Sequence, residues 1–261
     1  MLDNYYNINK LAINDEKTVL LVSCDNTMRT LANNIKFYAG NYLITQKDSI
    51  KILGYILNNK LTHDSYLKSI ISKVNYRLFT LGLISNYMST KNKIIITSSI
   101  IISVIRYSAL LMIDLNKKQL DTLNVLINKV AWRTLGYHSY RWTNLKILNK
   151  CKWLNGTQLI IYSIINMIHK VNINMVPKSI YELFEYKEIP NTRFIRTPYK
   201  LKYNPINNTI RNTSLYKGLF LYNKIPEGIK SMNGKKFNIA LKTHIVEKLP
   251  FDRINTYKDF I

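Results

Sequence analysis

The chain has 261 residues, of which 47% are hydrophobic, and this is enough to bury the core of one large domain or two small ones. It carries 38 Lys and Arg against 15 Asp and Glu, and the formal net charge of +23 favours a polyanionic partner. Its two cysteines, Cys24 and Cys151, lie far apart and without metal-ligand spacing, which argues against a disulfide framework or a zinc site. We therefore expect an intracellular protein, cytoplasmic or nuclear, and the N-terminus lacks the pattern of a signal peptide.

The positive charge is concentrated in the second part of the sequence. Residues 1–60 hold 7 Lys and Arg against 5 Asp and Glu, whereas residues 61–261 hold 31 against 10. The later part is therefore expected to contact the polyanion. An alternative source for some of the charge is the base composition of the gene, because Lys, Asn, Ile and Tyr have A/T-rich codons. Clustering of the charges on one face would separate the two explanations.

The first sixty residues have the pattern of short strands. The expected elements are strands at 17–23, 31–38, 42–45 and 50–57, with a turn at 39–41, which together make a small antiparallel sheet. Gly54 lies inside the last strand, where it indicates either a bulge or the close approach of another backbone or a ligand. Asn58 and Asn59 then predict a turn before a helix.

From Thr62 or Asp64 onward the apolar residues take the spacing of a helix, and either residue can cap its first turn. The expected inner face has apolar residues at intervals of three and four: Leu67, Ile70, Ile71, Val74, Leu78 and Leu81. The opposite face collects polar, aromatic and basic residues: Tyr66, Ser69, Lys73, Tyr76 and Arg77. Such a stripe is either a solvated basic face or a surface that contacts nucleic acid.

Residues 94–113 form a long apolar stretch in which Arg106 is the only charge. The stretch is long enough to span a membrane. A central arginine, however, costs about 2.5–3.5 kcal/mol to insert into a bilayer, and several Ser and Thr residues dilute the apolar character. We therefore expect a buried helix of a soluble domain, with a membrane helix as the alternative.

A further helix is predicted at 117–135, between a capping Asn116 and a terminal Gly136. Its inner stripe consists of Leu120, Leu123, Ile127, Val130 and Ala131. Lys129 and Arg133 form a basic pair on its outer side, one helical turn apart.

The remainder of the chain alternates between apolar helices and basic connections. Residues 138–142 mix polar and aromatic side chains, which suits either base stacking or a surface loop anchored by aromatic rings. Residues 157–171 predict an apolar helix that ends before Pro177, and residues 177–211 predict an extended basic segment with little regular structure. Residues 235–248 are again expected to be helical, with apolar positions at Phe237, Ile239, Ala240, Leu241 and Ile245.

Three motifs follow one another along the chain. Residues 14–18 form an Asn-x-x-Lys-Thr segment, residues 50–57 read Ile-Lys-Ile-Leu-Gly-Tyr-Ile-Leu, and residues 211–214 and 222–226 read Arg-Asn-Thr-Ser and Tyr-Asn-Lys-Ile-Pro. In this order they resemble motifs of the reverse transcriptases of non-LTR (LINE-type, jockey-like) retrotransposons. There they are the D motif of the palm, the E motif or primer grip, and the C-terminal end pattern. The family's usual Trp-Asn-x-Leu-Pro is replaced here by Tyr-Asn-x-Ile-Pro.

The resemblance implies an α+β protein in which a small antiparallel palm-remnant sheet precedes a mainly helical thumb and C-terminal region. The expected parts are a palm remnant at 1–61, a helical thumb-like domain at 62–176 and a basic C-terminal region at 177–261. The resemblance also implies that Leu53 and Gly54 approach the primer end. The side chains expected to bind nucleic acid are Lys51, Lys73, Arg77, Lys129, Arg133, Arg193, Arg196 and Arg211.

The metal-binding aspartates of this family are missing from the sequence. Polymerases hold two divalent ions with carboxylates, and family members supply them from an early palm Asp and an adjacent Asp-Asp pair, whereas no two aspartates are adjacent here. Lys17 matches the D-motif lysine that helps to neutralise the departing pyrophosphate, but this role is empty without metal ligands. We therefore expect no cofactor in this chain, and Mg²⁺ only if another chain completes the palm. The four histidines occur singly and fit no catalytic motif.

The sequence thus predicts a fragment of a LINE-type reverse transcriptase that binds RNA or an RNA–DNA template-primer through its thumb and is inactive alone. One alternative is the active half of a split enzyme, completed by a separate fingers and palm polypeptide. A second alternative is an inert relic of an inserted element. The third is a membrane-associated basic protein that uses residues 94–113, although no membrane is expected among the partners.

Overall fold

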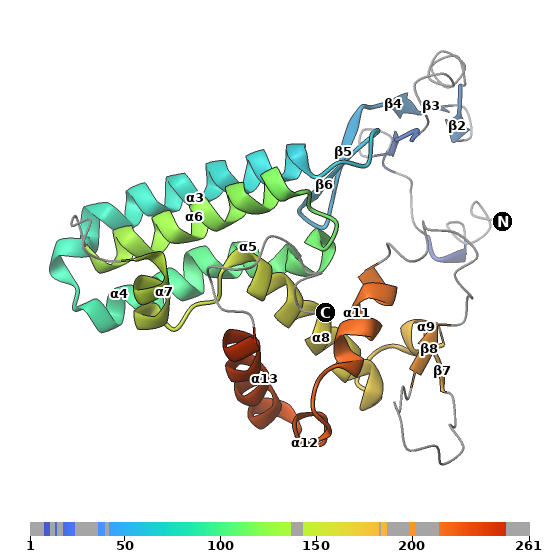
Figure 1. Cartoon of the computed structure of the whole chain (residues 1–261). Coiled ribbons are helices and arrows are strands. Elements are labelled where there is room, and N and C mark those ends of the chain that lie inside the picture. The colour runs from blue at the N-terminus through green and yellow to red at the C-terminus, as the bar shows by residue number, and fades with distance from the viewer. Residues whose placement is uncertain are drawn as a thin grey trace. The chain divides into compact units, whose positions relative to one another are not determined.

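The computed structural model of the chain describes residues 8–10, 14, 18–23, 36–39, 42–136, 143–182, 184–186, 199–201 and 214–248. These residues divide into two compact units, Met1–Ser69 and Ile70–Ile261. Short strands occupy the first unit and helices occupy most of the second (Figure 1). The predicted α+β class, with small sheets before a mainly helical remainder, is therefore confirmed.

The strands of the first unit form separate two-stranded pairs. In chain order they are β1 (Val19–Leu20), β2 (Tyr38–Ala39), β3 (Tyr42–Leu43), β4 (Thr45–Gln46), β5 (Ser49–Ile52) and β6 (Tyr55–Asn58). β2 pairs with β3 and β5 with β6, both antiparallel as expected, whereas β1 pairs with β4 in parallel. Strands of two residues contribute few ladder hydrogen bonds, so this unit draws little stability from its sheets.

The prediction of one strand over residues 50–57 is wrong, because β5 and β6 are the two arms of a hairpin. Leu53 and Gly54 form its two-residue loop, with φ angles of 47° and 88°. Two consecutive positive φ angles define a type I′ turn, whose twist matches that of the flanking strands. Glycine adopts this conformation readily, whereas leucine rarely does, and the sequence signal for the turn was therefore weak.

The hairpin is fastened to the start of helix α3 (Asp64–Ile84) by aromatic and polar contacts. The Tyr55 ring lies 4.1 Å from the Tyr66 ring between centroids, and the Tyr55 hydroxyl is 2.5 Å from Nδ1 of His63. Burial, followed by the nearby Tyr66, raises the pKa of Tyr55 to about 12. The Asn58 side chain meanwhile accepts from the Thr62 amide at 2.8 Å, which confirms the predicted turn before the helix.

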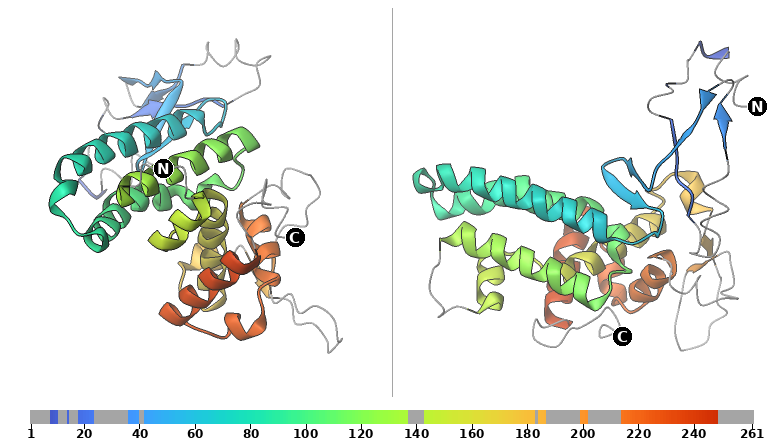
Figure 2. Two further views of the ribbon diagram at one scale, coloured as in Figure 1. Left: turned by 60° about the vertical axis from the view of Figure 1, so that its left-hand side comes forward. Right: turned by 90° about the horizontal axis from the view of Figure 1, so that it is seen from above.

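The helices of the described residues are drawn from further sides in Figure 2. After α3 they are α4 (Thr90–Thr97), a π-helical segment (Ser98–Ile102), α5 (Ser103–Ser108), α6 (Lys117–Leu135), α7 (Asn144–Cys151), α8 (Gly156–Asn172), α9 (Lys178–Tyr181), α11 (Ser214–Asn223), α12 (Glu227–Lys230) and α13 (Gly234–Lys248). Short 3-10 segments cover Ser85–Tyr87 and Ala109–Met112. A second hairpin pairs β7 (Phe184–Tyr186) with β8 (Tyr199–Leu201).

The inner face of α3 agrees with the predicted stripe at most positions. Leu67, Ile70, Val74 and Leu78 are buried, and Ile71 and Leu81 are half-buried. The assignment of Tyr66 to the outer face is wrong, since this side chain is only 3% exposed. Its burial comes from Tyr55 of the hairpin, a neighbour that helical periodicity alone does not reveal.

The apolar stretch around residues 94–113 folds as α4, the π-helical segment, α5 and a 3-10 turn. In the described part of the chain, Thr90–Met112 is the one helix whose length and composition would suffice to cross a membrane. One side of it lies in the protein core, where Ile101, Ile105 and Met112 are fully buried. The other side is exposed, so the expected burial is found on one side only, and Arg106 reaches the surface.

Helix α6 begins and ends at the predicted residues, because both caps are formed. Asn116 accepts from the Gln119 amide while the Gln119 side chain accepts from the Asn116 amide, and Gly136 ends the helix with φ of 68°. All five predicted inner residues of α6 are buried. Inside the core, the Thr134 hydroxyl donates to the Thr97 hydroxyl at 3.2 Å, which joins α6 to α4.

The later helices share a second apolar core. α8, which matches the predicted helix at 157–171, packs against both α11 and α13. The buried residues of this core come from α8, β7, α11 and α13 and include Ile161, Ile165, Ile168, Phe184, Leu221, Tyr222, Phe237, Leu241 and Ile245. The prediction of Ile239 as a core residue is wrong, because it lies about 200° around α13 from the buried Phe237 and is exposed. Within the segment 177–211, α9, β7 and β8 provide more regular structure than expected.

Candidate nucleic-acid interface

Two of the predicted basic pairs lie on neighbouring helices. Lys73 and Arg77 are one turn apart on α3, and Lys129 and Arg133 are one turn apart on α6. The two helices run side by side in every view (Figures 1 and 2). Lys73, Lys129 and Arg133 are exposed, whereas Arg77 is half-buried.

The structure does not merge the two pairs into one cluster. Nζ of Lys129 donates to Oδ1 of Asn75 at 2.9 Å, so Asn75 marks the flank of α3 that faces α6. The Arg77 guanidinium donates instead to the carbonyl of Ile100 in the π-helical segment. Asn75 and Arg77 are two residues apart, which separates their side chains by about 200° around the axis of α3. The two basic pairs therefore border α3 on opposite flanks.

Between these flanks, the outward face of α3 exposes large apolar side chains. Tyr76 is 73% exposed and Phe79 is 68% exposed, and Leu83 continues the same row one turn later. Several large apolar side chains that lie together and exposed on one helix face are typical of a binding surface. The sequence analysis indicated Tyr76, but it assigned Phe79 to neither face of the predicted helix.

The predicted primer-grip residues lie on the first hairpin. Lys51 is an exposed residue of β5 paired with Ile56, and Leu53 at the tip is 85% exposed. The tip therefore presents an apolar side chain on a turn whose φ angle leucine seldom adopts. The remaining predicted residues, Lys17, Arg193, Arg196 and Arg211, lie outside the described residues, as does the segment 138–142.

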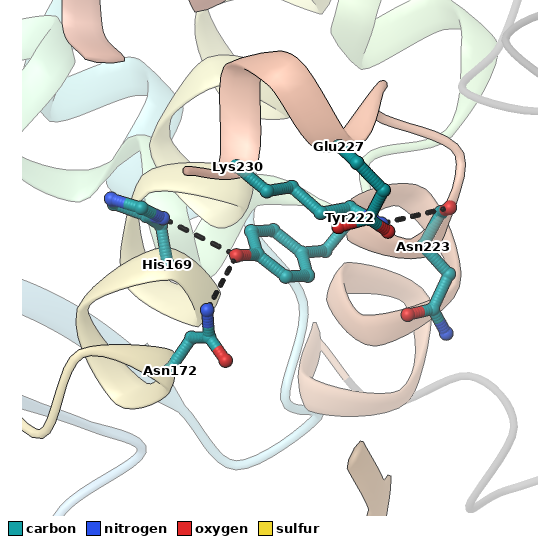
Figure 3. A network of polar contacts seen from close by, with 6 residues as sticks. All are labelled: His169, Asn172, Tyr222, Asn223, Glu227 and Lys230. Atoms are coloured by element: carbon teal, nitrogen blue, oxygen red, sulfur yellow. Dashed lines mark hydrogen bonds and ion pairs between the residues drawn. The ribbon is translucent and has the colours of Figure 1, made fainter. Parts of the chain in front are cut away.

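A polar network that the sequence did not indicate surrounds Tyr222 of the C-terminal end pattern (Figure 3). Tyr222 is fully buried, and its hydroxyl accepts from Nδ2 of Asn172 at 3.0 Å and lies 3.3 Å from Nδ1 of His169. The His169 ring stacks on Phe237 with centroids 3.5 Å apart. Three helices, α8, α11 and α13, are thus joined at one buried point.

A buried cation, Lys230, completes this network and lies over the Tyr222 ring. Nζ of Lys230 lies 5.4 Å from the centre of the Tyr222 ring, pairs with Oε1 of Glu227 at 2.9 Å and donates to the Asn223 carbonyl at 3.3 Å. Lys230 and Glu227 belong to α12, directly after the Ile-Pro of the end pattern. The motif therefore has a structural role, because it anchors the chain between α11 and α12.

Burial favours the neutral form of two titratable side chains, His169 of this core and Cys151 at the end of α7. Burial lowers the pKa of His169, and a backbone hydrogen bond with Met232 opposes part of this effect. Burial likewise raises the pKa of the Cys151 thiol to about 11, against the lowering effect of Lys150. A neutral thiol is a poor nucleophile, and we assign no catalytic role to these groups.

Metal binding and similarity give no further indication. Within the described ranges, no three His, Cys, Asp or Glu side chains gather in an arrangement that could hold a metal ion. No family model matches the chain, and neither a curated protein nor a solved structure matches it.

Proposed function

We propose that this chain is the C-terminal part of a LINE-type reverse transcriptase and that it binds RNA or an RNA–DNA template-primer through the outward face of α3. The observation that carries the proposal is the exposed Tyr76 and Phe79, bordered on one flank by Lys73 and Arg77 and on the other by Lys129. Rings between two lines of cations suit a strand whose phosphates follow the cations and whose bases meet the rings.

This arrangement favours nucleic acid with accessible bases over a fully paired duplex. Stacking of a base on an aromatic side chain contributes about 1–3 kcal/mol per base and needs an unpaired base. Phosphate contacts add affinity without sequence preference. We therefore expect single-stranded RNA, or the unpaired part of a template-primer, to be the preferred ligand.

Catalysis is not part of the proposed role of the isolated chain. The sequence lacks the family's adjacent aspartates, so Mg²⁺ and nucleotide incorporation would require a palm supplied by another polypeptide. The split-enzyme alternative is favoured by one observation in the first unit, where Phe37, Tyr38, Leu43, Ile52 and Leu53 are exposed. Exposed apolar residues on short strand pairs suit a surface completed by a partner.

The membrane alternative leads to a different expectation. Arg106 lies within the apolar helix and is exposed, while Ile101, Ile105 and Met112 pack in the core, so the helix suits a soluble domain. The cytoplasm or the nucleus stays the proposed location, on the sequence argument alone. A purified membrane fraction that retains the chain after a high-salt wash would favour the membrane alternative, whereas release by salt would favour the nucleic-acid proposal.

The test is binding of the purified chain to labelled RNA and to a labelled RNA–DNA hybrid across a salt series. For the hybrid, each phosphate contact contributes about 0.9 to the slope of log K against log salt. Replacing Lys73 and Arg77 by alanine should therefore reduce the slope by about 2. The matched control replaces Lys117 and Lys118, two exposed residues of the first turn of α6, and should change the slope less. Equal changes would mean that only the net charge matters, and the proposed interface would be wrong.

A further inference from the structure

Three further cations of the helical unit take part in none of the ion pairs found among the described residues. They are Arg106 of α5, Lys152 directly after α7 and Lys242 of α13. Nζ of Lys242 donates to the backbone carbonyl of Lys152, which joins two of the three directly. α5 and α13 both pack on α8, and the charge of Arg106 on α5 acts on Lys242 of α13.

The charges of both other cations act on Lys242. Burial lowers the pKa of Lys242, and the charges of Arg106 and Lys152 lower it further. Neighbouring positive charges repel one another unless an anion lies between them. The ion pairs of the described residues use other cations, namely Lys178, Lys217 and Lys230.

The backbone conformation of Lys152 is a second observation, because lysine is an unusual residue at this position. Lys152 has a φ of 56° and ends α7 in the left-handed conformation. The Trp153 amide donates to the Leu148 carbonyl at 2.9 Å and the Lys152 amide to the Asn149 carbonyl at 3.0 Å, which together form a Schellman motif. Glycine is the usual residue at this position, and lysine adopts the conformation less readily. The motif fixes the backbone from which the Lys152 side chain extends.

We propose that Arg106, Lys152 and Lys242 form a site for one phosphate group. The planar guanidinium of Arg106 can contact two phosphate oxygens, while the two ammonium groups act as compact point charges. The phosphate belongs either to a nucleic-acid backbone, in which case this inference rests on the proposed function and extends the interface to α5 and α13, or to a free phosphate compound. The chemistry of recognition is the same in both cases.

The experiment compares two probes on the full chain: inorganic pyrophosphate by calorimetry at constant ionic strength, and labelled single-stranded RNA across a salt series. The variant combines Arg106→Gln, Lys152→Gly and Lys242→Gln. We expect at least tenfold weaker binding of the probe that occupies the site. For RNA, the salt slope should fall by about 0.7, because one phosphate contact is lost and each contributes about 0.7 for a single strand.

Two controls keep the result decisive. Lys152→Gly alone places the preferred residue in the left-handed position, so it should preserve or raise the unfolding midpoint while still weakening binding. The triple variant Lys91→Gln, Lys117→Gln and Lys118→Gln removes the same charge from exposed positions elsewhere. Equal losses in the two triple variants would overturn the proposal, because the site would then add nothing to the general field of the protein.

The pattern across the two probes identifies the source of the phosphate. Loss of pyrophosphate binding with unchanged RNA binding supports a free phosphate compound, and loss of RNA binding alone supports a nucleic-acid backbone. A wild-type chain that binds pyrophosphate but no RNA would end the proposed function and leave the phosphate site standing. Unchanged binding of both probes by the site variant would overturn the site.

Discussion

The outward face of α3 and the core around Tyr222 use similar side chains in opposite ways. In the core, Tyr222 and Phe237 are buried, and the Tyr222 hydroxyl is in contact with Asn172 and His169. On α3, Tyr76 and Phe79 are exposed and cations border them on both flanks. The contrast teaches that aromatic residues of this chain stabilise the fold in one region and are available for a ligand in the other.

The largest effect on stability should come from Tyr222→Ala. Removing a fully buried aromatic side chain from a packed core costs about 3–5 kcal/mol of unfolding free energy. Tyr76→Ala, the matched change on α3, should alter stability by less than about 0.5 kcal/mol because the ring is exposed. Urea unfolding of both variants checks the contrast. A similar loss in the two variants would mean that the α3 face is covered within the folded chain.

Two helical glycines, Gly218 of α11 and Gly82 of α3, allow the same comparison between the packed core and the exposed α3 face. A Cβ on Gly218 of α11 would lie 2.5 Å from Cγ2 of Ile164, whereas a Cβ on Gly82 of α3 would meet no atom within 4 Å. Gly218→Ala should therefore destabilise by about 1–3 kcal/mol, and Gly82→Ala should stabilise by about 0.5–1 kcal/mol through helix propensity. Thermal unfolding midpoints moving in opposite directions would confirm this. Stabilisation by both changes would contradict the close packing of α11 on α8.

Acid should weaken the core. Burial lowers the pKa of His169, so the unfolded chain, whose histidines titrate near 6.5, binds this proton more readily than the folded chain does. The stability is therefore complete above about pH 6.5 and declines as the pH falls below it. The measurement is the free energy of unfolding between pH 8 and pH 5, in the native sequence and in His169→Phe. The variant should show a shallower decline, with a remainder from His244, whose pKa burial also lowers. An unchanged pH profile would exclude His169 as the source.

The smallest effect is expected at the hairpin tip. Leu53 holds a positive φ that asparagine adopts more readily, so Leu53→Asn should stabilise the first unit by a few tenths to about 1 kcal/mol. Hydrogen exchange of the β5 and β6 amides reports this local change. Faster exchange would indicate that the Leu53 side chain itself supports the hairpin.

Much of the helical structure was predictable because local signals agree with the packing. Asn116 and Gly136 bound α6 as the sequence predicts, since capping depends on residues only a few positions apart. Tyr66 and Ile239 were misassigned for different reasons. Tyr66 is covered by a hairpin eleven residues earlier, whose Leu-Gly turn lacks the usual signal, and Ile239 breaks the periodicity of its helix.

The candidate site was only partly predictable, because the sequence pattern does not show which helices pack against each other. Helical spacing places Lys73 with Arg77 and Lys129 with Arg133, but the flank on which each pair lies depends on contacts between helices. The proposed phosphate site uses Arg106, Lys152 and Lys242, which are up to 136 residues apart in the sequence. No local sequence pattern predicts that they belong to one site. Long-range packing therefore supplied what periodicity could not.

The central claim is that the α3 face binds nucleic acid through its exposed rings, and one titration tests it most directly. The affinity of the purified chain for labelled single-stranded RNA is compared with that of the double variant Tyr76→Ala, Phe79→Ala at fixed salt, with Tyr181→Ala as the aromatic control. Two lost stacking contacts of at least about 1 kcal/mol each predict a dissociation constant raised about 30-fold or more, with no change in the control or in net charge. Unchanged affinity in a folded double variant would contradict the claim.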